Sequence, residues 1–565
     1  MKLFSLRWLN PLPTLHRAAR ALANWRKRRH DLDYVMISLD GAIPALPESR
    51  SWVERRLFGT PVLSIWDIDQ AFRRATLDQR PKGVILFLRD PEVSLADVQT
   101  LRGIIERMRA AGKTVIAYAQ TYDLTSYLIA SACNRILMQP GGDFAPIGLF
   151  QRATFLKDVL AQVGVSLDVV AITPYKGAFD QLSRSEVSAE GREQIEWLLD
   201  SRYTIILEAI AASRGKTVDQ VREMIDTAPH LDIDALTQGY IDGLAYEENL
   251  PGLLESTHLI DWDEAERLLF IPTPPPHDPY VAVLPITGMM MSGESGGSPV
   301  PLPIDLPFVG EETAGDQTIV QQVRALINDE SAEAVVLFID SGGGAASAAE
   351  AMASALDELA KTRPVVAYMN GVAASGGYMV ACPAQWIVAQ PGTITGSIGV
   401  VSAKPVTGEL ETMIGARSIL FKRGLNADLF DTSAPFTESG RAVMFAQVKH
   451  SYQQFIERVA RARKQPVEAI DAVGGGRVWT GVQALEHGLV DQLGDLRAAV
   501  AKARELADLP DQTPAILFES DHRDVIAPIA AKVDPAGWAR VIKVARAIGS
   551  GRSLALMPFE IRRKG

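Results

Sequence analysis

Ser375 lies in a run of small residues whose pattern suits acyl transfer. Residues 373–378 (AASGGY) follow an apolar, β-branched stretch and open a helical pattern, so we expect the serine at a strand-to-helix turn. A second glycine loop, residues 340–344 (DSGGG), follows another predicted buried strand. Glycine N–H groups can approach a ligand closely and stabilise an oxyanion. A serine at a helix start is usually only an N-cap, and the flanking glycines are what favour a nucleophile.

A nucleophilic serine needs a base, and histidine is not a good candidate in this sequence. The eight histidines lie outside the glycine motifs, which argues against a Ser-His-Asp triad. Lys176 stands alone among apolar and small residues in the segment 172–179 (ITPYKGAF). A lysine acts as a general base only if burial lowers its pKa by several units. Read by itself, Lys176 would be a surface lysine.

The chain contains an internal duplication with offsets of 246 to 251 residues. DYVMISLDG (33–41) matches PYVAVLPITG (279–288), and GVILFLRD (83–90) matches AVVLFIDS (334–341). A further match, ALTQGYIDGL (235–244) with ALEHGLVDQL (484–493), closes each copy. Such self-similarity indicates one fold written twice.

The two copies differ where the chemistry is expected. Residues 89–93 (RDPEV) of the first copy replace the glycine loop and include a proline, which has no N–H. Ser375 aligns with Leu124, or with Thr125 if a gap is placed, and Lys176 aligns with Leu425. One copy therefore keeps a lysine and the other keeps a serine. This complementarity favours a Ser/Lys pair over an N-cap serine and an unrelated surface lysine.

Both copies alternate short apolar, β-branched runs with amphipathic helical patterns, which predicts α/β domains with parallel sheets flanked by helices. Residues 289–307, rich in Gly, Ser, Pro and Met, are expected to form a mobile loop, whose three consecutive methionines either line an apolar groove or belong to a plain insertion. The predicted organisation is a basic N-terminal segment (1–32), an N-terminal α/β domain supplying the lysine (33–270), a Pro-rich linker (271–279), a C-terminal α/β domain supplying the serine (280–510) and a C-terminal extension with a basic amphipathic end (511–565).

The composition excludes several classes of function. Hydrophobic residues make up 47% and charged residues 22%, as in an ordinary folded protein. A net charge of -11 argues against a nucleic-acid partner, which would need a basic surface. Cys133 and Cys382 are too few for a disulfide framework or a cysteine zinc site. With no P-loop, no HExxH and no clustered carboxylates of ligand spacing, we expect neither metal nor cofactor.

The N-terminal 30 residues are basic and contain no acid. No run of about 20 apolar residues follows, so we expect no spanning helix there. Apolar residues recur at helical spacing from Leu15 to Trp25, with arginine and lysine on the other face and at the end. This pattern is typical of a helix lying on anionic lipid, although a solvated tail or a helix packed on a partner fits it too.

These motifs resemble the long, duplicated form of signal peptide peptidase A, a Ser/Lys protease family with the ClpP/crotonase type of ββα fold. The resemblance covers roughly residues 33–510. It is carried by YKGAFDQ with Lys176, DSGGG, NGVAASGGYMVA with Ser375, TGSIGV (395–400) and GRVWTGVQALEHGLVDQLG (476–494). It implies Ser375 as nucleophile and Lys176 as base, donated across a domain interface. It also implies that Ser397 orients the lysine amine, and that Gly343 and Gly376 supply oxyanion N–H groups.

The resemblance further implies two tandem ClpP/crotonase-like domains and a bowl-shaped homotetramer that cleaves apolar peptides such as remnant signal peptides. The long family form usually begins with a spanning helix, where this chain has the basic amphipathic segment. We therefore expect peripheral attachment to a membrane surface, with the side left open. The leading hypothesis is a Ser/Lys endopeptidase. The alternatives are a non-catalytic membrane scaffold of protease descent and a crotonase-like acyl-CoA enzyme.

Overall fold

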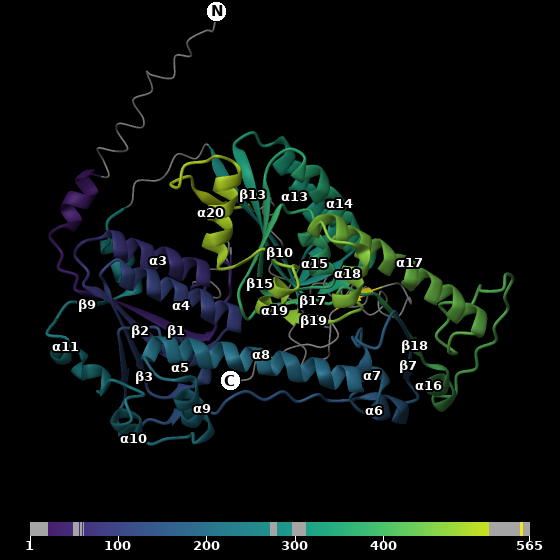
Figure 1. The fold of residues 1–565 in the computed structure, drawn as a ribbon, viewed down its shortest axis with the longest axis horizontal. Helices are drawn as coiled ribbons and strands as arrows, with labels where there is room; N and C mark the ends of the chain where they lie inside the picture. The colour runs from purple at the N-terminus through teal and green to yellow at the C-terminus, as the bar shows by residue number, and fades with distance from the viewer. Residues whose placement is uncertain are drawn as a thin grey trace, which may run out of the picture. The chain divides into compact units, whose positions relative to one another are not determined.

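The computed structural model describes residues 21–48, 56, 59, 61–271, 279–296, 312–518 and 554–556 (Figure 1). The chain divides into two compact units. The first holds Met1–Gly148, Ile206–Pro275 and Arg563–Gly565, and the second holds Leu149–Ile205 and Pro276–Arg562. The boundary at Ile205 falls inside the long helix α8 (Ala189–Arg214).

The described part of the first unit is built on a six-stranded sheet with the order β8-β5-β3-β2-β1-β9. Every neighbouring pair in this sheet is parallel. The strands are β1 (Tyr34–Ala42), β2 (Gly83–Glu92), β3 (Thr114–Ala119), β5 (Arg135–Met138), β8 (Gly243–Leu244) and β9 (Leu259–Asp261), with a separate pair β4 (Tyr122–Asp123) and β6 (Phe144–Ala145). β2 and β3 are buried on both faces, as parallel strands covered by helices must be.

Helices α3 and α4 lie side by side against this sheet (Figure 1). Each begins with a capping box, Ser64 with Asp67 in α3 and Ser94 with Asp97 in α4, which fixes the strand-to-helix turn. The helices of the first unit are α3 (Ile65–Leu77), α4 (Leu95–Ala110), α5 (Leu124–Ala130), α9 (Val218–Asp226), α10 (Asp232–Thr237), η2 (Glu247–Asn249), α11 (Leu250–Leu253) and α12 (Trp262–Leu268), together with the C-terminal part of α8.

The main sheet of the second unit repeats the first. Its parallel order β20-β16-β15-β13-β10-β21 matches β8-β5-β3-β2-β1-β9 strand for strand, which confirms the predicted duplication. β17 and β19 extend the sheet beside β15. The strands are β10 (Tyr280–Thr287), β13 (Ala332–Ser341), β15 (Val365–Ala374), β16 (Trp386–Ala389), β17 (Ile394–Gly396), β19 (Val478–Thr480), β20 (Gln492–Leu493) and β21 (Ala515–Leu517).

Helices pack on this sheet and enclose an apolar core, to which α13, α14 and α17 contribute buried side chains. The helices of the second unit are α6 (Lys157–Gln162), α7 (Asp180–Ser183), α13 (Asp316–Asn328), α14 (Ala346–Ala360), α15 (Gly376–Ala381), α16 (Gly408–Met413), α17 (Glu438–Arg463), α18 (Val467–Val473), α19 (Gly481–Glu486) and α20 (Leu496–Leu506), together with the N-terminal part of α8.

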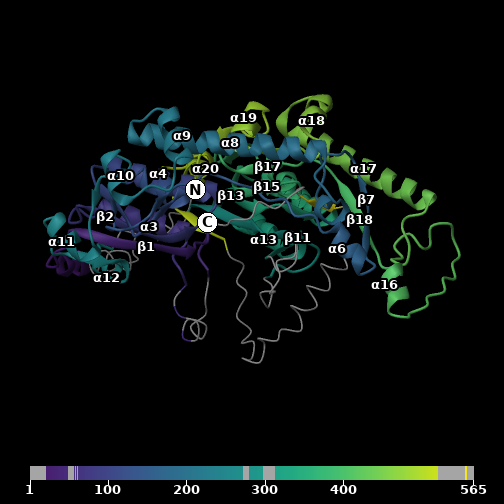
Figure 2. The same cartoon turned by 90° about the horizontal axis from the view of Figure 1, so that it is seen from below.

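A second sheet of the same unit joins segments that are far apart in sequence. Its order is β12-β11-β14-β22-β18-β7. The strands are β12 (Thr313–Gly315), β11 (Met289–Met291), β14 (Gly343–Ala345), β22 (Leu554–Leu556), β18 (Val401–Val406) and β7 (Ser166–Ala171). β7 and β18 lie side by side and are antiparallel, with α17 packed alongside (Figure 2).

This second sheet differs from two expectations of the sequence. Residues 149–205 belong to the same compact unit as residues 276–562, whereas the linker-based organisation assigned them to the N-terminal domain. The reason is the β7–β18 ladder, a pairing over more than 200 residues that local periodicity does not reveal. The three methionines 289–291 form the buried strand β11 and are not part of a mobile loop. Residues 297–307 of that predicted loop lie outside the described residues.

Both chain ends fall largely outside the described residues. Of the predicted amphipathic segment, residues 21–27 are helical, and Lys27 Nζ donates to the carbonyl of Leu269 over 2.8 Å. Leu22 and Trp25 on this helix are about half-exposed. Within the described ranges, no helix is both long and apolar enough to cross a membrane.

Candidate active site

Ser375 stands at the carboxyl end of β15, directly before the first residue of α15. Its backbone has φ 56° and ψ -114°, a region that non-glycine residues rarely adopt. The Ser375 N–H donates to the carbonyl of Gly396 over 2.8 Å, which holds this conformation. The side chain is buried and makes no N-cap hydrogen bond. The structure therefore does not support the reading of Ser375 as an ordinary helix cap.

Lys176 lies in the loop between β7 and α7 and is 1% exposed. Its Nζ is 2.8 Å from Oγ of Ser375. It is also 2.9 Å from the carbonyl oxygen of Ser397 and 2.9 Å from the Ser397 hydroxyl. Three residues that the sequence analysis had singled out therefore meet at one buried nitrogen, and all three lie in the second unit.

The environment of Lys176 disfavours its ammonium form. Complete burial lowers the pKa of Lys176 well below its ordinary value, because the charge would lose its hydration. Its three hydrogen-bond partners are neutral serine oxygens. The amine is thus suited to accept a proton from a neighbouring hydroxyl.

Ser397 follows β17 and also has a left-handed backbone, with φ 49°. Its N–H donates to the carbonyl of Arg477 over 2.6 Å. Since β17 pairs with β15 on one side and β19 on the other, the sheet fixes Ser397 relative to Ser375. A hydroxyl and a carbonyl of the same residue then orient the Lys176 amine.

A glycine turn before β19 forms the wall behind Lys176. A Cβ atom added to Gly476, whose φ is 95°, would lie 2.7 Å from the backbone N and Cα of Lys176. The Gly476 N–H donates to the carbonyl of Ile398 over 2.8 Å, and the Thr173 hydroxyl donates to the carbonyl of Gly475. Thr173 and Gly476 were not among the residues predicted from the sequence to support the lysine. The three successive glycines 474–476 were the available signal.

Aromatic side chains brace the same loop. Tyr175, next to Lys176, stacks on Trp197, and Trp197 stacks on Trp479 with ring centroids 4.9 Å apart. The guanidinium of Arg477 lies over the Tyr175 ring, 4.1 Å from its centroid. Trp197 also donates to the carbonyl of Val478 over 2.9 Å. These contacts tie the lysine loop and α8 to β19, and no motif in the sequence indicated them.

The two predicted oxyanion glycines lie next to each other. A Cβ atom on Gly376 would be 3.1 Å from Cα of Gly343 and 3.1 Å from Sδ of Met290, so only glycine fits at that position without displacement. The Gly376 residue opens α15, where helix N–H groups have no acceptor within the helix. The N–H of Gly343 donates instead to the Ser341 hydroxyl over 3.2 Å. The structure therefore brings the two glycines together, but the N–H group of Gly343 already donates to the Ser341 hydroxyl.

An extended segment pairs with the strand that contains Gly343. β22 is antiparallel to β14, with Leu556 opposite Gly343, and Leu554 is also opposite Val401 of β18. Residues 554–556 therefore occupy a strand position between β14 and β18. An extended polypeptide is thus accommodated beside the predicted oxyanion glycines.

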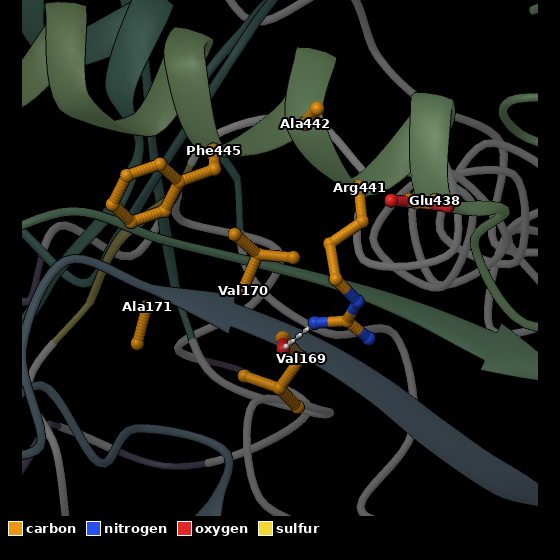
Figure 3. A pocket seen from close by; sticks show the side chains of 7 residues that line it. All are labelled: Val169, Val170, Ala171, Glu438, Arg441, Ala442 and Phe445. Atoms are coloured by element: carbon orange, nitrogen blue, oxygen red, sulfur yellow. Dashed lines mark hydrogen bonds between the residues drawn. The ribbon is translucent and has the colours of Figure 1, made fainter.

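A cavity of about 430 Å³ opens between β7 and α17 (Figure 3). Arg441 on α17 donates to the carbonyl of Val169 over 3.3 Å and forms an ion pair with Asp168. The remaining lining is mainly apolar and includes Val170 and Phe445. The contacts of Arg441 link α17 to the strand that precedes Lys176.

Among the described residues, no group of three or more His, Cys, Asp or Glu side chains is arranged to hold a metal ion.

Comparisons with known proteins agree with the motifs. The model of peptidase family S49 matches residues 107–257 and 357–510. The chain is 31% identical over 466 residues to "Serine protease SPPA, chloroplastic" of Arabidopsis thaliana, covering 81% of this chain and 68% of that protein. It is 30% identical over 503 residues to "Protease 4" of Salmonella typhi, covering 84% of this chain and 78% of that protein.

Among solved structures, the match to a point mutant of ClpP1 from Listeria monocytogenes covers 39% of this chain and 94% of the ClpP1 chain. The sequence identity is 14% and the TM-score is 0.24, so this similarity supports no argument.

The two family matches fall one in each copy of the duplication, and the two relatives align over most of both chains. The chain is therefore a tandem, SppA-type member of peptidase family S49 and a serine protease.

Proposed function

We propose that Ser375 and Lys176 are the catalytic dyad of an endopeptidase that cleaves extended, apolar peptides such as remnant signal peptides. The observation that carries the proposal is the 2.8 Å contact between Lys176 Nζ and Ser375 Oγ in a fully buried setting. The burial that lowers the pKa of Lys176 supports a neutral amine with a free electron pair.

In the proposed acylation step, Ser375 Oγ attacks the carbonyl carbon of the scissile bond, and its proton passes to Lys176 Nζ. The N–H group of Gly376 stabilises the oxyanion, together with that of Gly343 once this N–H turns from Ser341. The C–N bond breaks as the lysine ammonium returns the proton to the leaving amine. Ser397 positions the amine throughout by accepting its N–H groups.

Deacylation follows the same path with water as the nucleophile. Lys176 accepts a proton from the water, hydroxide attacks the acyl carbon, and the proton then returns to Ser375 Oγ as the ester bond breaks. The products are a carboxylate and a regenerated serine. No metal or cofactor takes part in these steps.

The substrate in this proposal is an extended strand. The antiparallel pairing of β22 with β14 supports an extended substrate. A strand paired in this way receives main-chain hydrogen bonds whatever its sequence, and specificity is left to its side chains.

The Ser/Lys chemistry is tested by incubating purified full-length protein with an apolar signal-peptide sequence and identifying the fragments by mass spectrometry. Ser375→Ala and Lys176→Met should each abolish the fragments. Lys404→Met replaces another buried lysine of the same unit and should retain them. Full cleavage by Ser375→Ala would overturn the proposal.

We also propose peripheral attachment to an anionic membrane through the basic N-terminal segment. Its support is the absence of acids in residues 1–30 and the half-exposed Leu22 and Trp25 on the described helix. Deletion of residues 1–20 should release the protein from vesicles that contain anionic lipid, and Trp25→Ala should weaken binding in the full chain. Undiminished vesicle binding by the deletion variant would contradict this attachment. We propose in addition that the protein forms a homotetramer, as the resemblance implies.

A further inference from the structure

The glycine turn 474–476 lies against Lys176 and has no side chain of its own to hold it in place. Gly475 and Gly476 have φ angles of 66° and 95°, in the left-handed region that glycine readily adopts. Glycine also loses more conformational freedom on folding than any other residue. Hydrogen bonds from neighbouring elements must therefore fix the shape of this turn.

Tyr452 on α17 supplies one of these hydrogen bonds. Its side chain is 6% exposed, and its hydroxyl oxygen accepts the N–H of Gly475 over 3.0 Å. The same hydroxyl donates to the carboxylate of Asp471 on α18. Because the carboxylate takes the hydroxyl proton, a lone pair of the phenol oxygen is left for the Gly475 N–H. Burial and the Asp471 carboxylate raise the pKa of Tyr452, so the hydroxyl keeps its proton.

The turn also contacts the loop of Lys176 and the backbone of Ser397. The carbonyl of Gly475 accepts the Thr173 hydroxyl, and the carbonyl of Thr173 accepts the N–H of Lys176 over 3.2 Å. Directly after the turn, the carbonyl of Arg477 accepts the N–H of Ser397 over 2.6 Å. The position of the turn therefore affects both the lysine and the Ser397 hydroxyl that lies 2.9 Å from its amine.

The internal duplication gives this turn a counterpart in the first copy. Helices α8 and α17 both have 26 residues and are separated by 249 residues at each end. At the same offset, α18 begins where α9 begins, but it ends two residues sooner. Residues 474–476 (GGG) stand there in place of residues 225–227 (IDT). The second copy thus has a glycine turn where the first copy continues its helix to Asp226.

Tyr452 and Asp471 differ in whether the first copy also has them. At the offset of 249 residues, Tyr452 corresponds to Tyr203, whereas Asp471 corresponds to Arg222. The tyrosine therefore occurs in both copies, and the carboxylate occurs only in the copy with the glycine turn. Packing of the helix would account for the tyrosine alone. It does not account for a carboxylate that is placed to accept the tyrosine hydroxyl.

We propose that Tyr452, oriented by Asp471, is a positioning residue for the Ser/Lys dyad and fixes the glycine turn that closes the pocket around Lys176. This role rests on the proposed dyad, because the turn acts on the reaction only through the lysine and Ser397. The turn is a close wall. A Cβ atom on Gly476 would lie 2.7 Å from Cα of Lys176, so no water molecule fits between the two backbones.

Loss of the Tyr452 hydroxyl would leave the buried N–H of Gly475 without its acceptor. An unsatisfied buried N–H is costly, so the turn would move or admit water. Either change would hydrate the amine of Lys176, whose pKa is lowered by burial. The ammonium form would then be less disfavoured, and the lysine would recover part of its ordinary pKa.

The pH profile of Ser375 acylation by a serine-directed probe tests the proposal in the full-length protein. Tyr452→Phe should lower the rate constant at the high-pH plateau about 10-fold. It should also move the midpoint of the profile to higher pH by about 0.5–1 unit. First-order rate constants measured by intact-mass spectrometry with excess probe do not depend on the fraction of active molecules. A lower yield of folded variant therefore does not imitate the expected result.

Tyr280→Phe is the matched control. Tyr280 is 8% exposed in the same unit, and its hydroxyl donates to the carboxylate of Asp329 over 2.7 Å. It begins β10, at the opposite end of the parallel strands from Ser375. Tyr280→Phe thus removes a similar buried hydroxyl and should keep the wild-type midpoint.

A second pair of variants leaves the tyrosine in place. Asp471 is exposed, so its replacement is compatible with folding even if Tyr452→Phe is not. Asp471→Asn retains an acceptor oxygen for the tyrosine hydroxyl and should stay near the wild-type midpoint. Asp471→Ala removes the acceptor and should shift the midpoint in the same direction as Tyr452→Phe.

The outcomes separate this role from the dyad itself. Wild-type midpoints in both Tyr452→Phe and Asp471→Ala, or equal shifts in Tyr452→Phe and Tyr280→Phe, would overturn the positioning role and leave the dyad intact. A labelling rate that does not fall in Lys176→Met would overturn the dyad, and the role of Tyr452 with it. A shift confined to Tyr452→Phe and Asp471→Ala would support the proposal.

Discussion

Lys176 Nζ and Ser375 Oγ lie 2.8 Å apart although the two residues are 199 positions apart in the chain. They meet because β7 pairs with β18, which brings the loop after β7 to the carboxyl ends of β15 and β17. Among the residues that the structure describes, the hydrogen-bond partners of the lysine amine are serine oxygens, and none is a carboxylate. This relationship determines how activity should depend on pH and on the residues that support the pair.

The rate of peptide cleavage should rise with pH through the pKa of Lys176. Burial lowers this pKa below its ordinary value, and only the neutral amine can accept the serine proton. Activity is therefore lost as pH falls below the lowered pKa, and it reaches a plateau before the ordinary lysine range near pH ~10.4. The measurement is kcat/KM for one peptide between about pH 5 and about pH 10, with protein stability checked at each pH. A flat profile, or a midpoint at the ordinary lysine value, would contradict the assignment.

Ser397→Ala should lower kcat about 10- to 100-fold with little change in KM. The substitution removes the hydroxyl 2.9 Å from Lys176 Nζ but leaves the Ser397 carbonyl in place. The amine keeps its charge state and loses part of its orientation. Ser397→Thr, which retains a hydroxyl, should recover part of the rate. If kcat were unaffected in Ser397→Ala, Ser397 would have no positioning role.

Gly476→Ala should reduce both activity and stability. Its Cβ would collide with the backbone of Lys176 at 2.7 Å, and its φ of 95° is strained for alanine. We expect a loss of about 1–3 kcal/mol in the free energy of unfolding and a large fall in kcat. Gly112→Ala is the matched control, because Gly112 has φ 80° and nothing within 4 Å of the added Cβ. It should lose about 1–2 kcal/mol of stability and keep its turnover per folded molecule. Equal kcat values in the two variants would argue against a role for Gly476 behind the lysine.

Removal of residues 554–565 should lower KM for peptide substrates. β22 pairs with β14 beside Gly343, where the proposed substrate strand would lie, so that the two compete. Removal of residues 557–565 alone keeps the strand and is the matched control. Steady-state kinetics of both truncations and the full chain provide the comparison. If KM does not differ between the two truncations, the segment 554–556 does not occupy the substrate position in solution.

Much of the fold could be predicted from the sequence because its signals are local. Buried apolar runs, helical periodicity and the duplication predicted two parallel α/β sheets, and both sheets have the same strand order. The assignment of residues 149–205 could not be predicted, because it depends on the antiparallel ladder of β7 with β18. The burial of the methionines 289–291 depends likewise on a second sheet that has no periodic signature.

The candidate site, like the fold, could be predicted from the sequence only in part. Ser375 and Lys176 could be paired from the complementary differences between the two copies, and the resemblance added Ser397. The supports of the lysine could not be predicted, because Thr173 contacts Gly475 over a separation of 302 residues. The hydrogen bond from Gly343 to Ser341 was also unforeseen, since a glycine-rich motif does not specify where its N–H groups point.

The reaction of a serine-directed acylating probe with the intact protein tests the dyad most directly. Intact-mass spectrometry should show one probe per wild-type chain, and peptide mapping should place it on Ser375. Ser375→Ala should take up none. Lys176→Met should react about 10²–10⁴-fold more slowly, while Lys404→Met, equally buried in the same unit, should react as the wild type does. Labelling at another residue, or equal rates in Lys176→Met and the wild type, would contradict the account.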